Sequence, residues 1–160
     1  MTEMIRLAQW KDIEKVSGLR LQYLELAHHG LTEEQRKQIY ASNLSYLNHH
    51  LNKDCFIAVT EVDDQLVSCA YMLLVEKAAN LYFPNGKHAE VYGVYTKPAY
   101  RRRQYATRQM ELLIEKAEEL EATYIELGAS EEGLEVYKKL GFVIAESEYQ
   151  PMQLNLKAKG

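Results

Sequence analysis

Three consecutive arginines, Arg101 to Arg103, lie between a strand-like segment that ends near Thr96 and a long segment of helical period. The first backbone N–H groups of a helix have no partner within it, and the helix dipole places about half a positive charge there. Such a strand–turn–helix unit suits a phosphate or pyrophosphate, and arginine adds charged donors that match phosphate oxygens. A solvated basic turn is the alternative for an arbitrary run of arginines, but the helix start behind this run favours a phosphate site.

The sequence around these arginines resembles the acetyl-CoA signature of the GNAT superfamily of N-acetyltransferases. That signature reads Gln or Arg, any two residues, Gly, any residue, and then Gly or Ala; Arg101 matches its first position and Ala106 its last. The resemblance implies that acetyl-CoA lies where two parallel strands splay apart, against strand backbone, with its pyrophosphate on the amides of residues 102–107. The cofactor contacts that it implies are Val94, Tyr95, Thr96, Arg101, Arg102, Arg103, Gln104, Tyr105, Ala106, Thr107 and Ser130.

A second segment also resembles the family. Tyr137 and the pair Gly141-Phe142 occupy the family's places, whereas Ser130 and Gly133 stand where the family often has Asn and Ala. The order of predicted elements is similar to the family's over essentially the whole chain. The resemblance therefore implies the GNAT-like acyl-CoA N-acyltransferase fold.

Gln104 departs from the signature, because the family has a glycine at this position. Glycine avoids a Cβ contact with the pyrophosphate and permits unusual backbone angles. We expect Gln104 to serve only if its dihedral angles are ordinary and its side chain points away from the ligand. Binding is then retained through the helix N-terminus and the arginines, with weaker cofactor affinity as the competing interpretation.

Direct acetyl transfer needs a base for the amine and an acid for the departing thiolate. By resemblance the acid is Tyr137, since a phenol with a pKa near 10 can protonate a thiolate whose conjugate acid titrates near 8.5; core packing is its alternative role. The preferred base is Glu90, which alternation places on the strand face of Val94. His88, on the same face, and Glu126, on the neighbouring strand, are alternatives.

The elements that must position these residues alternate between helical and strand periods. Helices are predicted at 10–27, from a capping box at Thr32 to Leu51, at 106–120 and at 131–140. Strands are predicted at 4–7, 55–60, 66–75, 88–95, 124–127, 142–145 and 152–156, with a long loop at 76–87. Residues 88–127 form a strand–helix–strand unit, which implies two parallel strands. We expect one α/β domain over residues 1–160, with a mixed, mostly antiparallel sheet and one splayed parallel pair.

The composition restricts the function class and the compartment. The formal net charge of −4 argues against a nucleic-acid-binding protein, whose surface is expected to be strongly basic. No apolar run approaches the roughly 18 to 20 residues that span a bilayer, and the N-terminus lacks the features of an export signal. Cys55 and Cys69 are isolated and predict reduced, buried thiols without metal-ligand spacing. A cytoplasmic protein without a metal is expected.

The resemblance implies transfer of the acetyl group of acetyl-CoA to a primary amine of a small molecule or peptide, with coenzyme A as product. A non-catalytic CoA-binding or regulatory domain on the same fold is the alternative. The acceptor is not determined by the sequence, and the resemblance allows a homodimer. Acceptor contacts are expected from residues 21–51 and 76–87, which contain Tyr23, His28, His29, Tyr40, Tyr46, Tyr82 and Phe83.

Overall fold

Five strands form one sheet in chain order in the computed structural model, which describes residues 1–156. The strands are β1 (Glu3–Leu7), β2 (Cys55–Val62), β3 (Gln65–Glu76), β4 (Lys87–Thr96) and β5 (Ile125–Leu127). Neighbouring strands are antiparallel except β4 and β5, which are parallel. The predicted mixed sheet with one parallel pair is therefore confirmed.

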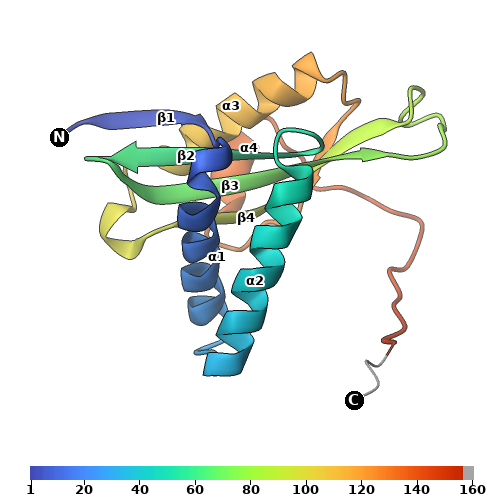
Figure 1. Cartoon of the computed structure of the whole chain (residues 1–160). Coiled ribbons are helices and arrows are strands. Elements are labelled where there is room, and N and C mark those ends of the chain that lie inside the picture. Colours follow the sequence, from blue (N-terminus) through green and yellow to red (C-terminus); the bar gives the residue numbers. More distant parts are fainter. Residues whose placement is uncertain (157–160) are drawn as a thin grey trace.

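Within residues 1–156, four helices lie on the two faces of the sheet (Figure 1). α1 (Ile13–Ala27) and α2 (Glu33–His50) cover one face, and α3 (Tyr105–Glu119) and α4 (Leu134–Lys139) cover the other. Short 3-10 turns, η1 (Trp10–Asp12) and η2 (Pro98–Tyr100), precede α1 and follow β4. No helix within residues 1–156 combines the length and apolarity needed to cross a bilayer.

The central strands are buried on both faces. Ile57, Val59 and Tyr71 pack toward α1 and α2, whereas their neighbours Ala58 and Met72 pack toward α3. This two-sided burial explains the continuous apolar run that the sequence shows in β3. Cys55 and Cys69 are buried free thiols, as predicted, and burial raises their pKa values to about 11 and about 12.

Local sequence signals explain two of the element boundaries. Thr32 caps α2, because its Oγ1 accepts from the Gln35 amide at 3.1 Å while Gln35 Oε1 accepts from the Thr32 amide at 2.9 Å. This capping box is as predicted. Asp63 and Asp64 form the turn between β2 and β3 with φ of 47° and 66°, the left-handed pair typical of a tight hairpin.

The C-terminal part of the chain differs from the prediction. The strands expected at 142–145 and 152–156 do not form, and the last helix is shorter than the predicted 131–140. From Phe142 onward the chain leaves the sheet, so Val143 is 85% and Leu154 84% exposed (Figure 1). A short apolar segment forms a strand only where a neighbouring strand pairs with it. β5 has only three residues, and within residues 1–156 its outer edge has no partner.

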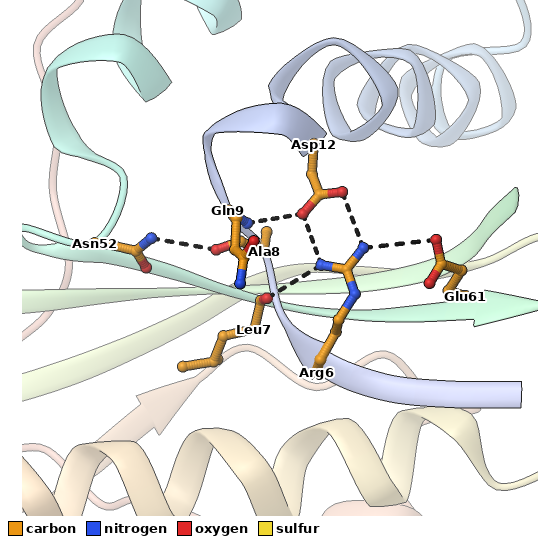
Figure 2. A network of polar contacts seen from close by, with 7 residues as sticks. All are labelled: Arg6, Leu7, Ala8, Gln9, Asp12, Asn52 and Glu61. Atoms are coloured by element: carbon orange, nitrogen blue, oxygen red, sulfur yellow. Dashed lines mark hydrogen bonds and ion pairs between the residues drawn. The ribbon is translucent and has the colours of Figure 1, made fainter. Parts of the chain in front are cut away.

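A polar network attaches the start of α1 to the sheet (Figure 2). The Arg6 guanidinium donates to both carboxylate oxygens of Asp12, at 2.7 and 3.0 Å, and the Gln9 amide donates to the same carboxylate at 2.8 Å. Glu61 of β2 lies 3.7 Å from Arg6, and Asn52 donates to the Ala8 carbonyl. The network thus sets the position of α1 over the sheet.

Candidate active site

Strand β4 changes its pairing halfway along its length. Its first half pairs with β5 through Ala89, Glu90 and Val91, opposite Ile125, Glu126 and Leu127. β5 ends at Leu127, but β4 continues to Thr96. Beyond Val91, the edge of β4 that faces away from β3 therefore has no strand partner within residues 1–156. The splayed parallel pair that the sequence implied is present.

The direction of the backbone groups shows which residues face this free edge. The Lys97 amide donates to the Val67 carbonyl of β3, and the Tyr95 carbonyl accepts from Ser68 Oγ at 3.1 Å. Backbone groups alternate between the two edges of a strand. Those of Val94 and Thr96 therefore face the free edge, where the resemblance expected cofactor contacts; the Tyr95 side chain is buried toward α1.

A bulge at Gly93 separates the two halves of β4. Gly93 has φ of 62°, and the β3–β4 register shifts between Cys69 and Tyr71. A Cβ at this position would lie 2.8 Å from Arg20 Nη1 and 3.1 Å from Tyr71 Cδ1. The positive φ and these two contacts favour glycine here, because any other residue would be strained and would displace Arg20.

The bulge corrects one sequence prediction. One extra residue in a strand moves the following side chains to the opposite face. Val94 packs toward α3, while Tyr92 packs toward α1 and α2. Glu90 precedes Tyr92 by two residues and so lies on the α1–α2 face, not on the face of Val94 as predicted.

The turn before α3 carries the three arginines into solvent and has strained backbone. Arg102 and Gln104 have φ of 65° and 62°, in the left-handed region. The condition set from the sequence, ordinary dihedral angles at Gln104, is therefore not met. Gln104 adopts the conformation that glycine favours, at a cost of about 1–2 kcal/mol. Its side chain forms no capping hydrogen bond to α3 within residues 1–156, so the first amides of the helix stay open to a ligand.

The side chains at and before the start of α3 differ in burial and in their hydrogen-bond partners. The buried Tyr105 hydroxyl donates to Glu3 Oε2 at 2.7 Å, and Arg108 donates to the other oxygen of Glu3 at 2.7 Å. Tyr105 thus anchors α3 to β1 and can offer a ligand only its amide. Arg101 Nε donates to the Thr96 carbonyl at 3.2 Å, which places its guanidinium beside the free edge of β4. Ala106 and Thr107 are half-buried.

Tyr137 of α4 is 8% exposed and packs its ring edge-on against Phe142. Burial, and then the nearby Tyr23, raise the pKa of Tyr137, which keeps its proton in place at neutral pH. A Cβ at Gly133 would lie 2.9 Å from the Tyr137 ring, so this glycine gives the ring its space. Ser130 Oγ accepts from the Gly133 amide at 3.1 Å and so helps to shape the turn into α4.

Three ionisable side chains meet across the paired half of β4 and β5. Burial, and then Glu126, raise the pKa of Glu90, whereas His88 lowers it. His88 is fully buried, stacks on Tyr124 at 4.9 Å, and has Nε2 at 3.4 Å from Glu126 Oε1. Within residues 1–156 neither ring nitrogen is aligned for a hydrogen bond.

The same three side chains could hold a metal ion. His88, Glu90 and Glu126 offer one ligand atom each, all within 4.8 Å of one another. No metal was expected from the sequence, where only the spacing of Cys55 and Cys69 was considered. The cluster arises only from the register of two strands that are distant in sequence.

A cleft of about 620 Å³ opens between α1, α2, β3 and β4. Its walls include Arg20, Asn43, Tyr46, Tyr71 and Tyr92. Of the residues expected to contact the acceptor, Tyr46 lines this cleft, whereas His28, His29 and Tyr82 are exposed elsewhere. Sequence reasoning missed Arg20, although its helical spacing from Tyr23 could have indicated a shared face.

Comparisons with known proteins agree with this geometry. The model of the acetyltransferase (GNAT) family matches residues 19–142. The chain is similar to the structure of a predicted acetyltransferase from Clostridium acetobutylicum with acetyl-CoA, with TM-score 0.80 and 25% identity over 95% of this chain and 96% of that one. A GCN5-related N-acetyltransferase from Ralstonia eutropha matches with TM-score 0.77 and 18% identity over 94% and 99%. No curated protein sequence matches this chain.

Proposed function

This chain belongs to the GNAT acetyltransferase family, and on that premise we propose that it is an active N-acetyltransferase. It moves the acetyl group of acetyl-CoA directly to a primary amine of a small molecule or peptide. The observation that carries the proposal is the free edge of β4 beyond Val91, which lies beside the open N-terminus of α3.

The residues around this edge fit a coenzyme A ester. Backbone groups of Val94 and Thr96 can bond to an extended amide chain, as a further strand would. The amides of residues 102–107 and the exposed Arg101 to Arg103 suit a pyrophosphate, and Ser130 lies at the turn into α4. When bound, acetyl-CoA supplies an activated thioester at the splay.

Glu90 is the proposed general base. Its raised pKa brings the carboxylate nearer to the basicity that removes a proton from an ammonium group at neutral pH. The proton passes to Glu90 directly or through one water, and Glu126 beside it stabilises the protonated carboxyl. His88 is too deeply buried to meet an acceptor.

Tyr137 is the proposed general acid. The freed amine nitrogen forms its bond to the acetyl carbon as the carbon–sulfur bond breaks, and the sulfur leaves with the electron pair. The Tyr137 hydroxyl then donates its proton to that sulfur, and the phenolate that remains takes up the second proton, which the new amide nitrogen releases. Its raised pKa keeps the proton available until the thiolate forms.

A melting experiment tests the cofactor site first. A ligand at a hundred times its dissociation constant stabilises a protein by about 2.7 kcal/mol, which in a domain of this size raises the melting temperature by roughly 5 to 10 °C. We expect acetyl-CoA to give such a shift and NAD, the control nucleotide, to give none. No shift at millimolar acetyl-CoA would contradict the proposal.

A non-catalytic CoA-binding or regulatory domain is the second candidate. The observation that favours it is Gln104, whose strained backbone and Cβ stand where the family's signature has glycine. Release of free thiol from acetyl-CoA, measured across a panel of amines, separates the two candidates. Cofactor binding without acetylation of any amine would favour the non-catalytic domain.

A further inference from the structure

Arg20 is the one charged side chain among the residues that line the cleft between α1 and α2, within the described part of the chain. The other lining residues are uncharged: they are polar or aromatic, with the aliphatic Leu24 and Ile39. The cleft therefore carries a local positive charge, although the whole protein carries a net charge of −4.

Three tyrosine rings and the β4 backbone hold Arg20 in place. Its guanidinium carbon lies 5.6 Å from the ring centre of Tyr23, 5.5 Å from that of Tyr71 and 5.7 Å from that of Tyr92. Nη1 lies against the bulge at Gly93, close to the point where β4 and β5 separate. Aromatic contacts attract the cation and fix its position without neutralising its charge.

No carboxylate within residues 1–156 pairs with Arg20. The ion pairs of the other arginines in this part of the chain involve Arg6, Arg36 and Arg108. Guanidinium N–H donors lie in the plane of the group, so stacking on its faces leaves them free for a ligand. A positioned cation with free donors beside a cleft is suited to a carboxylate or a phosphate.

We propose that this cleft binds the acceptor and that Arg20 selects amines that also carry a compact anionic group, a carboxylate or a phosphate. The inference rests on the proposed acetyl transfer. Glu90 and Tyr92 lie on the same face of β4, so an acceptor with its anion at Arg20 has its amine directed along β4 toward Glu90. A polycation without an acidic group is repelled by Arg20.

The tyrosines of the cleft stay neutral and do not repel the anion. Burial first, and then Cys55, raise the pKa of Tyr92 to about 12, and burial also raises the pKa of Tyr46. Asn43 donates to Ser17 at 2.8 Å and to the Tyr71 hydroxyl at 3.4 Å, which orients both walls. The hydroxyls are thus available as neutral hydrogen-bond partners for the rest of the acceptor.

A panel of matched amines tests the inference. The probes are β-alanine, its neutral amide, phosphoethanolamine and spermidine; β-alanine and phosphoethanolamine distinguish the two anions. Binding is measured by calorimetry with and without coenzyme A, and transfer by thiol release from acetyl-CoA. The variants are Arg20→Gln and, as a control that removes an equal charge on the adjacent helix, Arg36→Gln.

The expected result is a preference of the wild-type protein for an acidic amine over the neutral amide. A charged hydrogen-bond pair contributes about 1.5–3 kcal/mol, so Arg20→Gln should lower kcat/KM for the acidic amine by about 10- to 100-fold. The neutral amide should change less than about threefold, and Arg36→Gln should keep the wild-type preference. A purely structural role of Arg20 would instead lower kcat/KM for all amines alike.

Several outcomes would overturn the inference: no binding of any acidic amine, equal use of β-alanine and its amide, a preference that survives Arg20→Gln, or a preference for spermidine. Acetylation of amines without the acidic preference refutes the inference and leaves the proposed function standing. Arg20-dependent binding of an acidic amine without any acetylation refutes the proposed function and supports the anion site.

Discussion

Arg6 of β1 and Arg20, in the middle of α1, have contrasting surroundings. Arg6 forms a bidentate ion pair with Asp12, and Glu61 lies on the other side of its guanidinium (Figure 2). Arg20 is held by the faces of tyrosine rings beside a cleft, and no carboxylate within residues 1–156 pairs with it. Both side chains are partly buried cations on the same face of the sheet.

The difference separates a structural role from a ligand-binding role. The donors of Arg6 are used to connect β1, β2 and the start of α1, so its removal should lower stability. The position of Arg20 is set by aromatic packing, while its hydrogen-bonding capacity stays unused. Its removal should therefore change substrate binding more than folding.

Asp12→Asn has the largest expected effect on the structural side of this comparison. Breaking this buried ion pair leaves Arg6 with only the more distant Glu61, at 3.7 Å, and costs about 3 kcal/mol. We expect this loss in the free energy of unfolding, measured from urea midpoints with an unchanged m-value. Arg20→Gln is the matched variant and should lose under about 1 kcal/mol. Equal losses in both variants would remove the distinction between the two arginines.

The pH dependence of stability tests the same pair. Burial raises the pKa of Asp12, but the hydrogen bonds from Arg6 and from Gln9 outweigh burial, so the pKa lies below its ordinary value of 3.8. A group with a lowered folded-state pKa stabilises above its unfolded pKa and loses that contribution as the pH falls through the folded value. The stability difference between wild type and Asp12→Asn should therefore be constant above about pH 5 and shrink in acid. A difference that grows in acid would contradict the pairing.

Tyr137→Phe tests the proposed catalytic role of the Tyr137 hydroxyl, a polar group that, like Arg20, is available to a ligand. The change removes one oxygen from a buried ring, so the fold and the acetyl-CoA affinity should change little. Loss of a general acid should lower kcat by about a hundredfold. The readouts are initial rates and the acetyl-CoA melting shift. Unchanged turnover would assign Tyr137 to core packing alone.

Gly93→Ala should affect both stability and the cleft. The left-handed backbone disfavours alanine by about 1–2 kcal/mol, and its Cβ would lie 2.8 Å from Arg20 Nη1. Displacement of Arg20 should raise KM for an acidic acceptor. Gly18→Ala is the control, because nothing lies within 4 Å of its Cβ and alanine favours a helix by about 1 kcal/mol. A harmless Gly93→Ala would mean that the bulge can relax.

The sequence predicted the parts of the fold that local signals determine. The strands at 55–60 and 66–75 and the capping box at Thr32 depend on neighbouring residues, and all are present, the two strands as the antiparallel pair β2 and β3. The strands at 142–145 and 152–156 were predicted from their own apolar residues and do not form. Strand formation depends on a partner edge, which no local pattern reveals.

The arrangement of the candidate site was predictable where one segment carries it. The turn at Arg101 to Arg103, the start of α3 and the free β4 edge follow one another in the sequence. The face of Glu90 was misjudged because the bulge at Gly93 reverses the alternation that follows it. Arg20 was missed because its partners come from β3, β4 and its own helix, and only the tertiary structure brings them together.

Gln104→Gly has the smallest expected effect. It asks whether the strained Gln104 has a structural role, as Arg6 does, or a ligand-binding role, as proposed for Arg20. Gln104 has φ of 62°, and its side chain makes no capping hydrogen bond to α3 within residues 1–156. No capping contact therefore offsets the backbone strain at this residue. Glycine removes about 1–2 kcal/mol of strain but loses about 0.5–1 kcal/mol through the freer unfolded chain. The net gain should raise the melting temperature by about 1–3 °C.

Acetyl-CoA affinity, measured by calorimetry, should tighten or stay the same in this variant. Arg102→Gly, at the second left-handed position, is the control: it relieves similar strain but removes a cation, so it should weaken binding of a pyrophosphate. A large loss of affinity in Gln104→Gly would instead mean that the glutamine side chain contacts the cofactor. Gln104 would then belong with Arg20, as a group that the fold holds for a ligand.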